Sequence, residues 1–162
     1  CITVDGCMST NDSVMILANG ASSCPVIKQG LYLQEFSKAL DQVCLELAQL
    51  IVKDAEGATK FIRITVRQAK SFYEAKKIGL AIANSALFKT AIYGENPNFG
   101  RIVAAVGSSG IAVREQDLKM KVSPLSKKEV DVEVSVSRGK ESATIYTSDL
   151  TPEYIRINAE YN

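Results

Sequence analysis

The residue type that most limits the chemistry of this sequence is one that it lacks, because none of its 162 residues is a histidine. Ser-His-Asp and Cys-His activation of a nucleophile both need an imidazole, so neither can be assembled within this chain. Metal sites built on imidazole are excluded for the same reason. A general base must therefore be a carboxylate, a lysine, an α-amino group or a residue of another chain.

The four cysteines are Cys1, Cys7, Cys24 and Cys44. No pair has C-x-x-C spacing, so a zinc site would need scattered thiolates and is not expected. A cysteine at the start of a chain can act as an autoprocessed nucleophile with its own amine as base, which makes Cys1 a candidate. We expect the thiols to be reduced, as in a cytosolic setting.

Two further polar residues stand near the ends of expected helices. Glu56 precedes Gly57 at a helix end, where the helix dipole disfavours a carboxylate and a bound cation would compensate it. Asn158 lies in the terminal string INAEYN. Simpler interpretations are a solvated acid before a glycine cap and an amide that bonds local backbone. For each residue, the sequence alone leaves the functional and the simpler interpretation open.

The spacing of apolar residues predicts a mixed order of helices and strands around these candidates. Helices are expected at about 34–54, 72–84 and 100–106, and a short one after Thr151 and Pro152. Ser71 and Glu74 form a capping box for the second helix. Strands are expected at 1–6, 14–18 (buried), 59–66, 87–93, 118–122, 130–136 and 142–147.

The overall composition argues against two classes of partner. The 19 lysines and arginines nearly balance the 18 acids, and no block of like charge suggests a polyanion-binding surface. No apolar run is long enough to span a bilayer, and no signal peptide is visible. We therefore expect a soluble, cytoplasmic protein.

Several strings of the sequence, taken in order, resemble the β subunit of ornithine acetyltransferases. They are DGCMSTNDSVMILANG, DAEGATKFIRITV, AIANSALFKTAIYGENPNFGRIVAAVGSSG and SDLTPEYIRINAEY. Together they cover nearly the whole chain. The resemblance implies an α/β fold of mixed α+β type, a two-lobed sandwich of sheets and helices like those of DmpA and the ornithine acetyltransferases.

The resemblance also implies an activity, the transfer of acetyl from N-acetylornithine to glutamate in arginine biosynthesis. In this family a precursor cleaves itself before a threonine, which becomes the acetyl-accepting nucleophile at the start of the β subunit, with its amine as a plausible base. The oxyanion donors come from the α subunit, the expected assembly is α2β2, and no cofactor is implied. Acetyl-CoA is a further candidate donor. No threonine begins this sequence, so we expect the nucleophile to lie outside residues 1–162.

By the same resemblance, Glu56 and Asn158 bind the amino-acid substrate. A hydroxyl residue a little beyond Asn158 also contacts substrate in the family. Cys1 occupies an internal strand position of the family pattern, which weakens its claim as a nucleophile. Two functions from other classes remain as alternatives: an N-terminal-nucleophile hydrolase that uses Cys1, and a non-catalytic scaffold.

Four other residues are expected to be structural. Lys60 could pair with Glu56, and Arg101 opens a short helix. Asn11 and Asp12 shape a turn beneath the active site.

The chain departs from the family pattern at Cys7 (usually an acid), Phe99 (often tryptophan) and Ser108 (commonly tyrosine), and in a shorter stretch from 110 to 149. We expect residues 1–57 to belong to a larger sandwich domain shared with the α subunit. Residues 58–162 would form a mixed α/β domain.

Overall fold

A four-stranded mixed sheet forms the centre of the computed structural model, which describes residues 1–9 and 11–160. The strands are β1 (Phe61–Ala69), β2 (Lys119–Val122), β3 (Glu129–Ser135) and β4 (Glu141–Ser148), in the order β2-β3-β1-β4. β1 runs parallel to β3 and antiparallel to β4, and β2 runs antiparallel to β3. The strands predicted at 59–66, 118–122, 130–136 and 142–147 are thereby confirmed.

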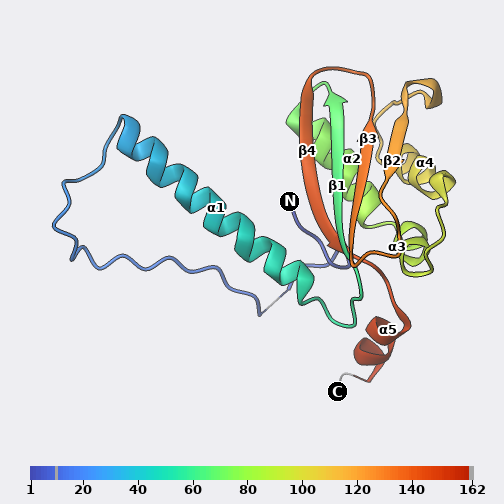
Figure 1. Cartoon of the computed structure of the whole chain (residues 1–162), viewed down its shortest axis with the longest axis horizontal. Helices are drawn as coiled ribbons and strands as arrows, with labels where there is room; N and C mark the ends of the chain where they lie inside the picture. The colour runs from blue at the N-terminus through green and yellow to red at the C-terminus, as the bar shows by residue number, and fades with distance from the viewer. Residues whose placement is uncertain (10, 161–162) are drawn as a thin grey trace.

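Three helices cover one face of this sheet: α2 (Phe72–Ala83), α3 (Ala86–Tyr93) and α4 (Phe99–Ser108) (Figure 1). The apolar core lies between the two layers, where alternate residues of β1 and β3 meet the helices. Its fully buried members include Ile62, Ile64, Val132, Ile78 and Ile82.

Only one of the two hydrogen bonds of the predicted capping box is present. Ser71 Oγ accepts from the Glu74 backbone N–H at 3.1 Å and so caps α2. The Glu74 carboxylate, however, accepts from Arg138 Nε at 2.7 Å and from the Lys70 backbone N–H at 3.4 Å. The second bond of a capping box would have returned to Ser71.

The strand predicted at 87–93 is wrong, because this segment is helix α3. Ser85 caps the helix by accepting from the Phe88 N–H at 3.3 Å. Phe88, Ala91 and Ile92 are buried, and their spacing of three and four residues is the apolar stripe of a short amphipathic helix. A short apolar run of this kind fits either a strand or a helix, and packing against the sheet favours the helix.

The first 57 residues lie largely apart from this layered unit. Helix α1 (Leu31–Lys53) projects away from the sheet in Figure 1 and confirms the helix predicted at about 34–54. The strand predicted at 14–18 is wrong for the structure described, in which these residues belong to no strand or helix and are exposed. A strand needs a neighbour to satisfy its backbone, and the described chain offers this segment none. The predicted domain boundary near residue 57 remains a prediction.

Residues 1–3 do meet the sheet, beside β4. Ile2 forms an isolated parallel bridge with Tyr146, in place of the strand predicted at 1–6. The Thr3 N–H donates to the Tyr146 carbonyl and the Tyr146 N–H donates to the Cys1 carbonyl, each at 3.0 Å. The β4 edge of the sheet is therefore partly covered.

Among the described residues, none of the helices combines the length and the apolar character that a membrane span requires.

Candidate active site

The last helix, α5 (Pro152–Ala159), is fixed at its start to the turn that contains Glu56. Thr151 caps it by accepting from the Tyr154 N–H at 3.1 Å, as the Thr151–Pro152 pair predicts. The same hydroxyl donates to the Gly57 carbonyl at 2.7 Å. Gly57 has φ +65°, and a Cβ there would lie 2.5 Å from the Tyr154 nitrogen. Only glycine therefore allows this close approach.

This packing brings together Glu56 and Asn158, the two predicted site residues, across 102 positions of sequence. Asn158 Nδ2 donates to Glu56 Oε2 at 3.1 Å and to the Tyr154 carbonyl at 3.0 Å. Both side chains are exposed. With Nδ2 occupied in this way, the Asn158 amide oxygen and the Glu56 carboxylate are two acceptors side by side. Such a pair suits a ligand that carries an ammonium group.

A second pair of residues lies next to the first. The Tyr154 hydroxyl donates to Asp5 Oδ2 at 2.7 Å, and the Cys7 N–H donates to Asp5 Oδ1 at 2.8 Å. The Cys7 N–H and then the Tyr154 hydroxyl lower the pKa of Asp5 below its usual range. The hydrogen bond to Asp5 raises the pKa of Tyr154 to about 12, so the tyrosine stays protonated and the aspartate ionised at neutral pH.

A buried lysine supports the loop that carries Asp5. The Lys89 ammonium, from α3, donates to the Val4 carbonyl and lies 3.4 Å from Thr147 Oγ1. Lys89 is only 3% exposed. Burial lowers its pKa to about 8, against the opposing attraction of Asp5 and Asp149.

Sequence reasoning missed Asp5, Tyr154 and Lys89. Tyr154 could have been found from Asn158, because residues four apart on a helix share a face. Lys89 could not, because its segment had been assigned to a strand. Asp5 follows an isolated bridge, and its side chain meets Tyr154 only through the tertiary fold.

Lys60 does not pair with Glu56, so that suggestion is wrong. Its ammonium contacts Glu95 Oε1 at 2.8 Å and the Leu125 carbonyl. Lys60 is a buried residue directly before β1, and both of its partners lie in other segments, after α3 and between β2 and β3. Its role is structural, as expected.

Arg101 is also structural. It donates to the Leu87 carbonyl at 2.6 Å and to Thr90 Oγ1 at 3.2 Å, and so ties α4 to α3. The predicted turn at Asn11 and Asp12 is present, since both backbone N–H groups donate to Ser9 Oγ at 3.2 and 3.1 Å. The Cys1 thiol is exposed.

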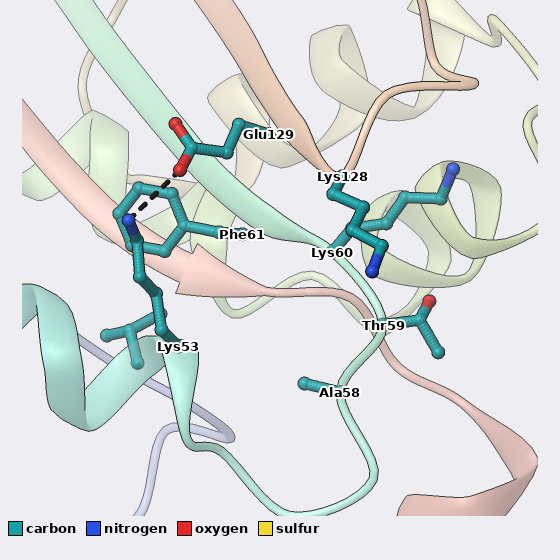
Figure 2. Close-up of a pocket in the computed structure, with 8 residues that line it drawn as sticks. Lys53, Ala58, Thr59, Lys60, Phe61, Lys128 and Glu129 are labelled. Atoms are coloured by element: carbon teal, nitrogen blue, oxygen red, sulfur yellow. Dashed lines mark hydrogen bonds and ion pairs between the residues drawn. The ribbon is translucent and has the colours of Figure 1, made fainter.

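A groove of about 310 Å³ lies between the end of α1, the start of β1 and the residues that begin β3. Figure 2 shows Lys53 reaching across Phe61 to Glu129, with Nζ and Oε1 3.0 Å apart. Lys60 and Lys128 line the opposite side of this groove. Neither Glu56 nor Asn158 lines it, so the groove is distinct from the predicted site.

Comparisons with known proteins identify the class to which this fold belongs. The structure matches the crystal structure of the arginine biosynthesis bifunctional protein ArgJ from Bacillus halodurans, with a TM-score of 0.92 at 34% identity. The match covers 99% of this chain and 85% of that one. The expected mixed α/β fold class is thereby confirmed.

The ArgJ family profile matches residues 1–126 and 119–162, and this chain belongs to the ArgJ family. The two matches overlap at residues 119–126, which span β2 and the start of the turn before β3. The expected resemblance to ornithine acetyltransferases is thus confirmed.

Curated relatives agree. The chain is 46% identical to the arginine biosynthesis bifunctional protein ArgJ of Geobacter sulfurreducens over 99% of its own length and 46% of that protein. It is 43% identical to the glutamate N-acetyltransferase of Methanopyrus kandleri over 99% of its length and 47% of that protein. The chain therefore spans about half the length of the curated relatives that it matches.

Proposed function

We propose that this chain is the substrate-recognition part of a glutamate N-acetyltransferase, an enzyme that moves acetyl from N-acetylornithine to glutamate in arginine biosynthesis. The observation that carries the proposal is the contact between Glu56 and Asn158, which sets two oxygen acceptors side by side in a chain of the ArgJ family. The relatives named above carry the acetyltransferase and arginine-biosynthesis names that motivate this substrate pair.

In the reaction we propose, the hydroxyl of a threonine outside residues 1–162 attacks the acetyl carbonyl of N-acetylornithine. The carbon–nitrogen bond then breaks, ornithine leaves with a proton on its amine, and the acetyl group remains on the threonine as an ester. The free amine of glutamate attacks this ester, and the threonine hydroxyl is regenerated. The α-amino group of the threonine serves as the base in both halves.

Within that scheme Glu56 and Asn158 bind and orient, and neither takes part in bond making. The Glu56 carboxylate would accept from the side-chain ammonium of the ornithine moiety, and the Asn158 amide oxygen would accept a second hydrogen from it. Holding the ammonium at a fixed place sets the distance between the acetyl carbonyl and the nucleophile.

The exposed apolar surface of residues 8–51 supports a partner chain in this enzyme. Side chains that would be buried in most folded proteins are exposed along α1 and the segment before it, among them Phe36 at 55%, Leu47 at 54%, Leu17 at 94% and Val14 at 91%. We propose that the α subunit of the same precursor covers this surface and supplies the oxyanion donors, in an α2β2 assembly that works in the cytoplasm.

The test is to produce the chain together with the remaining parts of its precursor and to incubate the complex with acetyl-labelled N-acetylornithine. The proposal predicts the label first on a threonine of the complex, detected by intact mass and peptide mapping, and then on added glutamate. Acetyl-CoA is assayed in parallel as a second donor. Label transfer without any acyl-threonine would contradict the mechanism, and the absence of transfer would contradict the function.

A further inference from the structure

We propose that Tyr154 and Asp5 form a clamp that positions Asn158 against Glu56, which makes Tyr154 a positioning residue for substrate binding. This inference rests on the proposed function and adds residues to which the sequence assigned no role. Its starting point is that α5 has no buried residue along its eight positions. A helix without a buried face depends on polar contacts for its place.

The contacts that hold α5 lie on one side of the helix. Thr151, Tyr154 and Asn158 follow one another at spacings of three and four residues, so all three face the same way. Thr151 donates to the Gly57 carbonyl, Tyr154 to Asp5 and Asn158 to Glu56, at 2.7, 2.7 and 3.1 Å. Tyr154 is thus the middle one of three successive contacts.

Tyr154 also holds Asn158 directly. The Tyr154 carbonyl accepts from Asn158 Nδ2 at 3.0 Å, which leaves the amide only one orientation that also serves Glu56. The position of the Tyr154 backbone is in turn set by its side chain, because the hydroxyl is anchored 149 positions away at Asp5. Loss of the hydroxyl would therefore free the turn of helix on which the Asn158 amide depends.

Asp5 can serve as an anchor because its own loop is tied to the helical layer at two places. Thr3 Oγ1 donates to Asn84 Oδ1 at 2.7 Å, at the end of α2, and accepts from the Gly6 N–H at 3.1 Å. The Val4 carbonyl accepts from the buried Lys89 of α3. The clamp thus connects the recognition pair to the core of the domain.

The experiment uses the assembled enzyme carrying Tyr154→Phe, which removes one hydroxyl and keeps the ring. We expect KM for N-acetylornithine to rise about tenfold or more while kcat changes by less than about threefold, because ground-state binding is what the clamp supports. Hydrogen exchange of the α5 amides should become faster, with the thermal midpoint nearly unchanged. Tyr73→Phe, on an exposed tyrosine of α2, is the matched control and should change none of these.

Asp5 variants give a graded second test. Asp5→Asn keeps an oxygen that can accept from Tyr154 and should raise KM less than Tyr154→Phe does, whereas Asp5→Ala should raise KM at least as much as Tyr154→Phe, because it also removes the acceptor of the Cys7 N–H. The double variant Asp5→Ala/Tyr154→Phe should be no worse than Asp5→Ala, because both changes remove the same contact. Additive losses would overturn the clamp.

Ornithine binding, measured by calorimetry, separates the clamp from the proposed reaction. A wild-type complex that transfers no acetyl but binds ornithine more tightly than its Tyr154→Phe variant would overturn the function and support the clamp. An active wild type with normal KM and normal α5 exchange in Tyr154→Phe would overturn the clamp and leave the function standing. A wild type that neither transfers acetyl nor binds ornithine would overturn both.

Discussion

Arg138 donates from Nε to Glu74 Oε1 at 2.7 Å and joins the β3–β4 turn to the first turn of α2. Arg138 Nη1 also donates to the Ala112 carbonyl at 2.6 Å, so one guanidinium links three segments. The glutamate is 8% exposed, and its bond from Arg138 lowers the pKa of Glu74. The pair is the best shielded ion pair among the described residues for which side-chain exposure is known.

Glu74→Gln should therefore destabilise the fold without touching the candidate site. Replacing the charged acceptor by an amide should cost about 1–2 kcal/mol of unfolding free energy, and lower the thermal midpoint by about 2–8 °C. The folded-state pKa of Glu74 lies below the unfolded value, so the loss should be present at neutral pH and shrink as pH falls through that pKa.

The exposed pair Arg67–Glu133 offers the matched control, with side chains 53% and 48% exposed at 2.9 Å. Glu133→Gln should cost less than about 0.5 kcal/mol because solvent already screens that pair. Equal losses for the two variants would mean that Arg138 is not a structural link.

Lys89 should make the free energy of unfolding depend on pH in the alkaline range. Its pKa is about 8 in the folded chain and 10.5 without the fold, so between these values the unfolded chain binds a proton that the folded one has released. The free energy of unfolding should accordingly rise from pH 8 to pH 10.5, by at most about 3 kcal/mol. Urea unfolding at several pH values measures this slope.

Lys89→Met should remove that rise, whereas Lys77→Met, on an exposed lysine of α2, should keep it. If the free energy of unfolding depended on pH in the same way for wild type and Lys89→Met, Lys89 would be ordinarily solvated in the folded protein.

Gly57→Ala should damage the candidate site more than the fold. A Cβ at Gly57 would lie 2.5 Å from the Tyr154 nitrogen and 2.8 Å from the Glu153 carbonyl carbon, so α5 would have to move. We expect KM for N-acetylornithine to rise about tenfold or more. The thermal midpoint should fall by only about 2–8 °C, because an alanine at this left-handed φ costs about 1–2 kcal/mol while α5 buries no side chain. Gly107→Ala, where a Cβ meets nothing within 4 Å, should leave KM unchanged and add about 0.5–1 kcal/mol of stability.

The sequence predicted the sheet better than the surroundings of the site. Alternation such as Val130, Val132 and Val134 identifies a strand because one face is buried and the other solvated. The prediction for residues 87–93 was wrong because a short apolar run fits the period of a strand and that of a helix, and only packing distinguishes the two. The prediction of a buried strand at 14–18 was wrong because burial depends on a partner surface that the sequence does not describe.

The candidate site, too, was predicted only in part from the sequence. Glu56 and Asn158 came from the family resemblance, and their mutual contact follows from the packing of α5 on the Gly57 turn, which no local pattern predicts. Asp5 and Tyr154 lie 149 positions apart and carry ordinary local signals, a DG turn and an aromatic on a helix. Contacts of that range are set by the fold as a whole.

Glu56→Gln tests the proposed recognition role most directly. The amide keeps the size of the side chain and an oxygen that can accept from Asn158, and it removes only the charge. If the ornithine ammonium pairs with Glu56 in a site closed by the partner chain, losing that charge should lower kcat/KM for N-acetylornithine by about 10- to 1,000-fold. The thermal midpoint should barely move, because Glu56 is exposed and packs against nothing in the core.

Steady-state kinetics and thermal unfolding of Glu56→Gln in the assembled enzyme make the measurement, with Glu115→Gln, an exposed glutamate of the segment Glu115–Asp117, as control. The control should retain wild-type kinetics, since it removes the same charge elsewhere on the surface. The charge argument also predicts that added salt weakens N-acetylornithine binding to the wild type and to Glu115→Gln, but hardly affects Glu56→Gln, which has no charge left to screen. Near-normal kcat/KM in Glu56→Gln would mean that Glu56 is only a solvated acid beside a glycine turn and does not bind the substrate.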